Sequence, residues 1–404
     1  MKLKVFLNMY GIRQEVGLLL QDKKRIFFEY APDFLKSGIE LSPFKLPLKS
    51  GVFEEKSYIF DGLFGLFNDS LPDGWGCLLL DRKLRKMGKS YAEITPLDRL
   101  SLIGADPMGA LEYEPADGET DLYGDVELDS LSCEVDRILD GEESTVLDEL
   151  LKLNGSSGGA RPKIVAYVSS DRQKIIHGGK SAPDGFTPWI IKFSEKHDPQ
   201  TSGELEYRYS LAAKAAGITM PETHLFPLKD GRGCFGVQRF DRTPDGKVHT
   251  HTACGLLHAS HRFASLDYEN LLKLTWILTR NHADVVEMAR RMIFNVKSCN
   301  KDDHSKNFSF LLNKDNQWQL APAYDLTLSA GINGEQTCMV NGKGRDISDA
   351  DLIKAATAAG VTEADTKDII EQINTALFQY KILGELKIML TRSLFLSKTQ
   401  VFCH

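Results

Sequence analysis

The sequence predicts an α+β protein in which a β-rich amino-terminal module and a mixed lobe are followed by a mostly α-helical lobe. Strand-like alternation of apolar residues occurs within the first 30 residues and again at 164–168 and 188–193. Apolar residues at helical spacing dominate from about residue 243 onward. The 404 residues suffice for two or three domains, and a hydrophobic share of 42% is that of a globular protein.

The cysteines and the amino terminus indicate the compartment. Seven cysteines are scattered without a Cys-x-x-Cys pair, which argues against a disulfide framework and against a thiolate zinc site. Residues 1–5 resemble a strand, and no apolar run approaches the roughly 18 residues of a membrane span. We therefore expect a cytoplasmic protein without a membrane partner.

The amino-terminal module is predicted from three strands and the helices after them. The strands cover 2–8, 15–20 and 25–30, with turns at Gly11 and at 22–24. A helical stretch begins near Leu63, and a second helix covers 75–87. The second helix is basic and amphipathic, so it could contact nucleic acid, although such a pattern more commonly belongs to a helix with one solvated face.

An acidic segment separates the module from the rest of the chain. Residues 112–149 contain 15 Asp and Glu against the single basic residue Arg137, so this segment carries −14 and the remaining chain +7, for a net charge of −7. We interpret it as a solvated connector or a set of exposed helices. The expected division is a β-rich module at 1–111, a connector at 112–150, a mixed lobe at 151–243 and a helical lobe at 244–404.

A glycine-rich loop begins the mixed lobe. It covers 155–163 and includes Gly158, Gly159, Arg161 and Lys163. Adjacent glycines let backbone N–H groups approach phosphate oxygens, and the two basic residues add charge. The loop matches neither Gly-x-Gly-x-x-Gly nor a Walker loop, and taken alone it is a weak signal, since a glycine-rich loop before a strand is usually just a turn.

A buried strand and a helix follow the loop. Alternation over 188–193 places Trp189 and its apolar neighbours on one face and Lys192 on the other. A lysine in so apolar a strand needs an anionic partner, unless it reaches solvent at a sheet edge. In the next helix, Glu204 can form a capping box with Thr201, which leaves Glu206 as the better partner.

The helical lobe contains the most informative motif. Helices are predicted at 268–280, 284–296, 349–358 and 364–378, and the second should end just before Ser298, leaving Asp302 on a loop. Asn307 follows five residues later. An apolar strand (308–312), a polar turn (313–316) and a second strand (318–321) then lead to Asp325. The nucleotide cleft is expected between the two lobes.

This order of residues is typical of phosphoryl transfer from ATP. Asp302 can orient the attacking hydroxyl, Asn307 and Asp325 can hold Mg²⁺ on the phosphates, and the hairpin returns Asp325 to Asp302. Without the hairpin and the second Asp, the spacing from Asp302 to Asn307 alone would favour a solvated loop. The candidate nucleotide-contacting residues also include His304, Ser305, Lys306 and Tyr324.

Together these segments resemble the HipA family of bacterial Ser/Thr kinases, the toxin halves of type II toxin–antitoxin pairs. The resemblance covers nearly the whole chain and implies a protein-kinase-like fold, distantly related to phosphoinositide kinases. Its markers lie at 69–75, 102–111, 156–163, 191–192, 238–242, 302–307 and 322–325.

The resemblance implies specific roles. Asp302 is similar to the family's catalytic base, Asn307 and Asp325 to its Mg²⁺ ligands, and Lys192 to its nucleotide-phosphate lysine. The loop residues Gly158, Gly159, Ala160, Arg161, Pro162 and Lys163 should cover the ATP phosphates, and Gln238, Arg239 and Phe240 should form the hinge whose backbone contacts adenine.

The resemblance also implies regulation and partners. Ser156 matches the family's autophosphorylation site, where a phosphate would expel the loop, but Ser157 beside it leaves the modified residue open. The implied partners are a protein substrate, such as an aminoacyl-tRNA synthetase, and a helix-turn-helix antitoxin through which DNA is bound indirectly. The loop departs from the family's valine- and glutamine-containing version, and the amino-terminal module is retained.

Different functions and sites are compatible with some of these residues. The same Asp, Asn and Asp serve any hydroxyl acceptor, so a small-molecule or lipid kinase is an alternative, as is a non-catalytic co-repressor. The cluster His249, His251, Cys254, His258 and His261 fits no standard zinc pattern. For His304, a ring that fixes the loop by hydrogen bonding is a better prediction than a proton shuttle.

Overall fold

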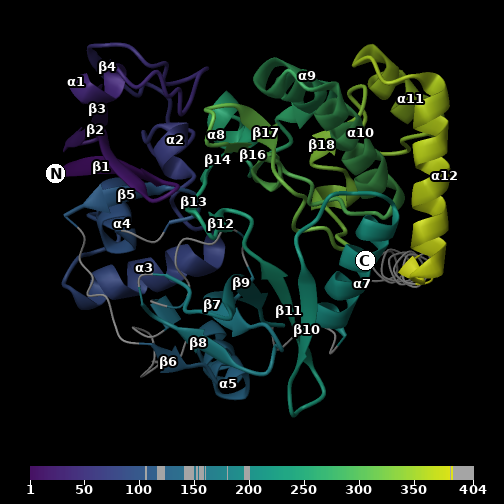
Figure 1. Ribbon diagram of the computed structural model, residues 1–404, viewed down its shortest axis with the longest axis horizontal. Coiled ribbons are helices and arrows are strands. Elements are labelled where there is room, and N and C mark those ends of the chain that lie inside the picture. The colour runs from purple at the N-terminus through teal and green to yellow at the C-terminus, as the bar shows by residue number, and fades with distance from the viewer. Residues whose placement is uncertain are drawn as a thin grey trace, which may run out of the picture. The chain divides into compact units, whose positions relative to one another are not determined.

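The protein divides into two compact units, and Figure 1 labels their helices and strands. The computed structural model describes residues 1–104, 107–115, 123–140, 150–151, 153, 159, 161–179, 181–194, 201–382 and 384. Unit 1 consists of Met1–Glu204, Pro221–Ser260 and Phe308–Ala321. Unit 2 consists of Leu205–Met220, His261–Asn307 and Pro322–His404. Among the described residues, no helix is both long enough and apolar enough to cross a membrane.

The amino-terminal part of unit 1 is a five-stranded antiparallel sheet in the order β4-β3-β2-β1-β5. Alternate residues of β1, among them Leu3, Val5 and Leu7, are buried, as a strand with one solvated face requires. The three predicted strands and both turns are confirmed, with Gly11 and Lys23 at positive φ. The strands are β1 (Lys2–Met9), β2 (Ile12–Asp22), β3 (Arg25–Tyr30), β4 (Val52–Glu54) and β5 (Leu111–Glu114).

Helices lie between these strands along the chain. The helix predicted at 75–87 is present as α3, with its bounds shifted by one residue at each end. The helical stretch predicted near Leu63 is a single turn, α2. Thr95 and Asp98 form a capping box at the start of α4. The helices are α1 (Pro32–Leu35), α2 (Gly65–Asn68), α3 (Gly74–Lys86) and α4 (Pro96–Ile103).

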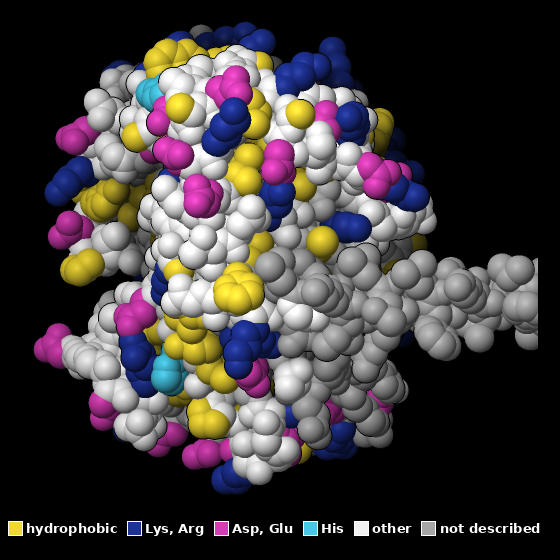
Figure 2. Space-filling model, turned by 90° about the vertical axis from the view of Figure 1, so that its right-hand side faces the viewer, with side chains coloured by type: hydrophobic (Ala, Val, Ile, Leu, Met, Phe, Trp, Pro, Cys, Tyr) yellow, Lys and Arg dark blue, Asp and Glu magenta, His cyan; other side chains and the backbone are white. Residues whose placement is uncertain are grey.

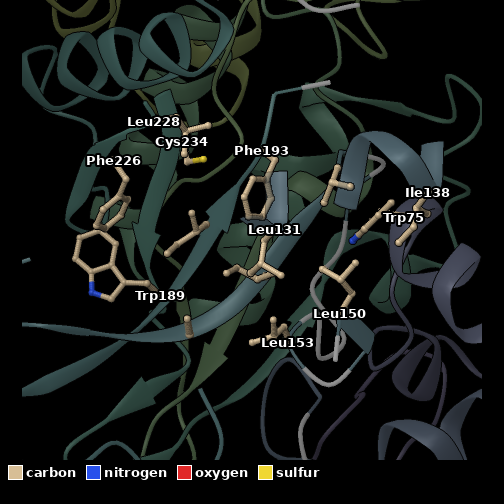
Figure 3. Close-up of a cluster of buried hydrophobic side chains, with 14 of the residues drawn as sticks. Trp75, Leu131, Ile138, Leu150, Leu153, Trp189, Phe193, Phe226, Leu228 and Cys234 are labelled. Atoms are coloured by element: carbon tan, nitrogen blue, oxygen red, sulfur yellow. The ribbon is translucent and has the colours of Figure 1, made fainter. Parts of the chain in front are cut away.

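The second sheet of unit 1 has six antiparallel strands in the order β10-β11-β9-β7-β8-β6. Its buried face packs with helices α3 and α5 in one core, in which Trp75 and Leu131 lie with Trp189 and Phe193 (Figure 3). The elements are β6 (Gly124–Asp125), α5 (Leu128–Leu139), β7 (Lys163–Ser169), β8 (Ile175–His177), β9 (Phe186–Lys192), β10 (Thr223–Pro227) and β11 (Gly233–Gln238).

The described part of the acidic segment is more integrated than a solvated connector. Residues 111–114 form β5, where Glu112 is buried and contacts Arg13 and Lys247. Helix α5 buries Leu131, Val135 and Ile138 in the shared core, and its acidic residues Asp129, Glu134 and Asp136 are partly exposed. An amphipathic helix can carry many charges and still bury its apolar face in the core. A count of charges along the sequence does not reveal this burial.

A smaller sheet in unit 1 contains the predicted hairpin. Strands β16 (Ser309–Leu312) and β17 (Trp318–Leu320) pair antiparallel, and β14 (His249–Thr252) pairs with β16. The Asn313 carboxamide oxygen accepts from the backbone N–H groups of Asp315 and Gln317, which stabilises the predicted polar turn. Nearby elements of unit 1 are β12 (Arg242–Thr243), β13 (Gly246–Lys247) and α8 (Ala253–Leu257).

Unit 2 is mostly helical, as predicted. Helix α10 ends at Lys297 with Ser298 as its C-cap, and α11 has the predicted bounds. The start of α7 precedes unit 2, and the rest of the helix buries Glu206, Tyr209 and Ala212. The elements are α7 (Ser202–Ala215), β15 (Leu266–Asp267), α9 (Tyr268–Thr279), α10 (His282–Lys297), η1 (Ser305–Asn307), η2 (Ile332–Gly334), β18 (Cys338–Met339), α11 (Asp349–Ala358) and α12 (Glu363–Gln379).

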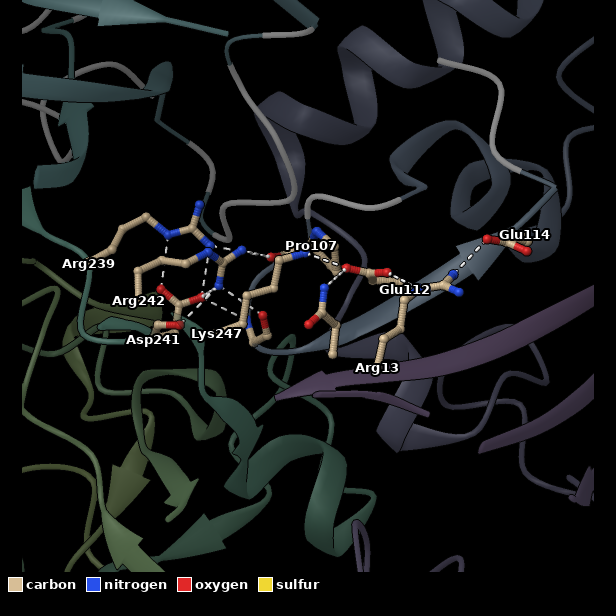
Figure 4. Close-up of polar contacts among 10 residues, drawn as sticks. Arg13, Pro107, Glu112, Glu114, Arg239, Asp241, Arg242 and Lys247 are labelled. Atoms are coloured by element: carbon tan, nitrogen blue, oxygen red, sulfur yellow. Dashed lines mark hydrogen bonds and ion pairs between the residues drawn. The ribbon is translucent and has the colours of Figure 1, made fainter. Parts of the chain in front are cut away.

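A buried polar network connects the two large sheets of unit 1 (Figure 4). Asp241 is fully buried and pairs with Arg239 and Arg242 at 2.8 and 2.7 Å. Its carboxylate also accepts the Gly109 N–H at 2.7 Å, and both arginines donate to the Pro107 carbonyl. Burial alone would raise the pKa of Asp241, but the two guanidinium charges outweigh it and hold the pKa well below its ordinary value.

Candidate active site

The loop after α10 carries the first candidate residue. Asn281 caps the start of α10, and the helix delivers the chain to a loop in which Asp302 is exposed and Asp303 is fully buried. The loop then closes in the 3₁₀ turn η1, whose last residue is Asn307. The prediction that Asp302 lies on a loop is therefore confirmed.

Asn307 lies beside Asp302. The Asn307 Nδ2 donates to the Asp302 carbonyl oxygen at 2.8 Å, and the Asn307 N–H donates to the His304 carbonyl oxygen. Because the amide nitrogen is used inside the loop, the carboxamide oxygen is the atom that can serve as a ligand. An oxygen ligand is what Mg²⁺ prefers.

Asp325 is brought to the same loop. The Asp325 carbonyl oxygen lies 3.5 Å from the Asn300 Nδ2, and the Tyr324 hydroxyl donates to the Lys306 carbonyl oxygen at 2.5 Å. Asp325 has φ of +58°, a conformation in which non-glycine residues are uncommon and which is often found at functional sites. Asp302, Asn307 and Asp325 therefore lie on two segments that are hydrogen-bonded together. Their side chains contain carboxylate and amide oxygens, the kind of ligand that fits Mg²⁺.

The remaining loop residues have structural contacts. Ser305 and Lys306 are buried. The Nδ1 atom of His304 is buried without a hydrogen-bond partner among the described residues, and the hydrogen-bonding role of this ring stays a prediction. Its ring instead packs edge-on against His261, with centroids 5.8 Å apart.

The phosphate-side candidates lie in unit 1. Lys192 is directly opposite Lys163 in the β7–β9 register, on the face away from Ile164 and Ile191. The prediction that Lys192 and Trp189 lie on opposite faces of the strand is confirmed, since Trp189 lies in the core (Figure 3). The Lys192 Nζ lies over the Phe235 ring, 5.7 Å from its centroid.

The described part of the glycine-rich loop lies next to Lys163. Gly159 has φ of +95°, a backbone conformation that favours glycine, and a Cβ there would lie 2.4 Å from the flexible end of the Lys163 side chain. The Gly159 N–H donates to the Asp73 carboxylate at 2.9 Å. Arg161 and Pro162 are described, whereas Gly158, Ala160, Ser156 and Ser157 lie outside the described residues.

Some hydrogen-bonding groups of the hinge candidates already have partners within the protein. The Gln238 N–H donates to the Glu222 carbonyl oxygen, the Arg239 N–H donates to that of Pro188, and the Arg239 side chain pairs with Asp241. Gln238 and Arg239 could therefore contact adenine through their carbonyl groups and not through these N–H groups. The roles of Gln238, Arg239 and Phe240 stay predictions.

The histidines of the sequence cluster have structural contacts, and the His249 and His251 rings lie 6.3 Å apart. His251 bridges Asp69 at 2.6 Å and Ser42 at 3.0 Å, and the His251 and Ser42 side chains are buried. Burial lowers the pKa of His249 to about 3, and its Nε2 lies 3.4 Å from the Leu41 carbonyl oxygen. Among the described residues no group of three His, Cys, Asp or Glu side chains is placed to hold a metal ion.

Sequence reasoning missed Asp303 and the residues around it. Asp303 accepts hydrogen bonds from the Tyr268 hydroxyl, the Gln336 carboxamide and the N–H groups of Thr337 and Cys338. Burial raises the pKa of Asp303 to about 6 despite these donors. The consecutive aspartates at 302 and 303 were the only signal in the sequence, and it does not reveal which one is buried.

Comparisons with known proteins agree with this architecture. The model of the HipA N-terminal domain matches residues 3–114, and the model of the HipA-like C-terminal domain matches residues 155–379, more than half of the chain. The Sinorhizobium fredii protein named "Putative kinase Y4dM" is 26% identical over 344 residues, which are 80% of this chain and 78% of that protein.

Two further proteins extend the comparison. A Haemophilus influenzae protein named "Putative kinase" is 28% identical over 34% of this chain and 44% of that protein. The HipA structure from Shewanella oneidensis MR-1, solved with HipB and operator DNA, covers 94% of this chain and 90% of its own with a TM-score of 0.70. At 19% identity this likeness shows the fold. With both family models matched in order and the fold shared, this chain belongs to the HipA family.

Proposed function

We propose that this chain is an ATP- and Mg²⁺-dependent Ser/Thr protein kinase that acts as the toxin of a type II toxin–antitoxin pair. The observation that carries the proposal is the joining of two segments in unit 2: Asp302 and Asn307 lie on one, Asp325 lies on the other, and Asn300 and Tyr324 hydrogen-bond across them. The names of the two kinase relatives support it.

Each residue has a distinct proposed role. Asp302 orients the acceptor hydroxyl and accepts its proton, and Asn307 and Asp325 hold the metal by oxygen atoms. When bound there, Mg²⁺ would supply positive charge against the charge that develops on the phosphates during transfer. Lys192 and Lys163 supply positive charge toward the nucleotide phosphates, and the loop at 158–163 covers them.

The proposed acceptors are a hydroxyl of a cellular protein and the chain's own glycine-rich loop. A phosphate at Ser156 or Ser157 would place a dianion in a loop suited to contact nucleotide phosphates, and like charges would then oppose ATP binding. The loop would gain other partners for its phosphate, and activity toward other proteins would fall.

The proposal is tested by phosphoproteomics after brief expression of the wild type and of Asp302→Asn in the same cells. New Ser or Thr phosphorylation that requires intact Asp302 supports a protein kinase. A metabolite or lipid whose phosphorylation requires intact Asp302 would instead identify a small-molecule or lipid kinase. Identical phosphoproteomes and metabolites with both proteins would contradict catalysis and favour a binding role.

Lys192→Ala should weaken ATP binding and lower the rate together, each by about tenfold or more, because it removes a phosphate contact present in both the ground and transition states. ATP titration by calorimetry and initial-rate kinetics measure the two effects. Lys174→Ala is the matched control, since the Lys174 side chain is 61% exposed and pairs with Asp125 on the surface. Unchanged ATP affinity in Lys192→Ala would place the phosphates elsewhere.

The proposed partner is a helix-turn-helix antitoxin, as the HipB and operator DNA of the Shewanella complex suggest. The net charge of −7 opposes phosphate contacts by this chain alone. On the face shown in Figure 2, the described lysines and arginines lie among aspartates and glutamates. In the basic helix α3, Arg82 donates to the Ile138 carbonyl oxygen and Arg85 lies over the Tyr91 ring.

Gel-shift titrations should therefore show little specific DNA affinity for this chain alone and tighter operator binding by its mixture with the antitoxin than by the antitoxin alone. Holding two antitoxin units at half-site spacing raises their effective concentration without new base contacts. A competing mixed-sequence DNA is the control. Tight, sequence-specific shifting by this chain alone would refute the proposal that DNA is bound only through the antitoxin, and would make α3 a candidate DNA contact.

A further inference from the structure

Asp303, next to the candidate catalytic residue, has the opposite environment to Asp302. It is fully buried, whereas Asp302 is exposed. A buried carboxylate is costly unless it is well hydrogen-bonded, and Asp303 accepts four such bonds. The Tyr268 hydroxyl and the Gln336 Nε2 donate to Oδ2 at 2.7 and 2.9 Å, and the N–H groups of Thr337 and Cys338 donate to Oδ1 at 2.8 and 3.1 Å.

These bonds join the Asp302 loop to a segment that follows Asp325. The Gln336 carboxamide also donates to the Asn300 carbonyl oxygen at 3.1 Å, and the Thr337 hydroxyl donates to that of Lys301 at 2.9 Å. Cys338 then pairs with Leu266 in the parallel bridge of β15 and β18, just before α9. Residues 336–338 are therefore held by side-chain and backbone bonds to one short stretch, 300–303.

A second path leads from Asp303 to Asp325. The Tyr268 hydroxyl, which donates to Asp303, accepts from the Asn295 Nδ2 at 2.9 Å. The Asn295 Oδ1 accepts from the Asn300 Nδ2 at 3.0 Å, and this nitrogen also lies 3.5 Å from the Asp325 carbonyl oxygen. Tyr268, Asn295 and Asn300 are each at most 1% exposed. From Asn300 through Asn295 and Tyr268 the donors follow one direction and end on the Asp303 carboxylate, an order in which successive bonds polarise and strengthen one another.

We propose that Asp303, Tyr268, Asn295 and Asn300 are positioning residues, which hold the Asp302 loop, the Asp325 backbone and residues 336–338 in one fixed arrangement. The kinetic consequence rests on the proposed kinase function, but the structural consequence does not. Phosphoryl transfer depends on the placement of the acceptor and the metal ligands, so a small displacement of either aspartate lowers the rate.

Tyr268→Phe is the sharpest test because it removes one hydroxyl and keeps the ring. Hydrogen–deuterium exchange of the full-length protein should be faster by about tenfold at 299–304 and at 323–338 together. Loss of a hydrogen bond to a charged group shifts the equilibrium between the closed and open states by about tenfold or more. Thr275→Val is the matched control: Thr275 is equally buried on the same helix, but its hydroxyl donates to the Leu271 carbonyl oxygen. Gln336→Ala is a second variant, with the same two regions expected to respond.

Kinetics give an independent readout. Tyr268→Phe should lower kcat about tenfold with little change in the KM for ATP, because the lysines assigned to phosphate binding are unaltered. Exchange that rises only within α9, or equally in Thr275→Val, would overturn the proposal, as would wild-type kcat in Tyr268→Phe. A wild type without phosphoryl transfer would refute the proposed function, whereas the exchange result would still decide the positioning role.

Discussion

Asp302→Asn and Asp325→Asn should each lower phosphoryl transfer at least about a hundredfold in the purified protein while leaving it folded. Each change keeps the size of the side chain but removes the charge that orients the acceptor or holds the metal, and loss of one such preorganised interaction typically costs about this much. Both residues lie outside the packed core: Asp302 is exposed and Asp325 is half-buried. Stability should therefore change little.

The measurement is phosphate incorporation from labelled ATP with Mg²⁺, followed by tandem mass spectrometry of the loop that contains Ser156 and Ser157. Asp315→Asn provides a control, since Asp315 is exposed in the turn of the β16–β17 hairpin. Circular dichroism monitors folding. Incorporation at the wild-type rate in either active-site variant would show that the assignment of that aspartate is wrong.

Asp241→Asn should lower the free energy of unfolding of unit 1 by about 3–5 kcal/mol, because it leaves Arg239 and Arg242 without the carboxylate they share. The Arg239 side chain is 2% exposed and that of Asp241 is 0% exposed, so water cannot replace the lost contact. Denaturant titration, followed by hydrogen exchange in β7 and β9 to identify the unit that unfolds, measures the loss. Asp33→Asn is the control, since it removes an exposed ion pair with Lys36 and should change stability very little.

The pH dependence of this difference follows from the direction of the pKa shift. The folded pKa of Asp241 lies below its unfolded value, so the stabilisation is present above the unfolded pKa of about 3.9 and is lost as the pH falls through the folded pKa. The gap between the wild type and Asp241→Asn should therefore be the same at pH 5 and pH 7. A gap that closes between pH 7 and pH 5 would mean that the carboxyl is not held in its ionised form.

Some features follow from the sequence because their causes are local. Alternation predicts β1, β2 and β3, and helical spacing with caps predicts α9 to α12 to within two residues. The hairpin follows from two short apolar strands around the Asn313 turn. The position of Asp302 on a loop follows from the end of α10, and the opposite faces of Trp189 and Lys192 follow from the two-residue period of a strand.

Other features were decided only by tertiary structure, because they depend on partners distant in sequence. Asp302 and Asp303 are identical in type, but Tyr268 and Gln336 bury the second and leave the first exposed. Charge density marks 112–149 as solvated, whereas β5 and α5 bury part of it against strands far along the chain. The Asp241 carboxylate needs Gly109, 132 residues away, to complete its hydrogen bonds. The sequence determines which groups are present, and the fold determines their partners and hence their charge, exposure and role.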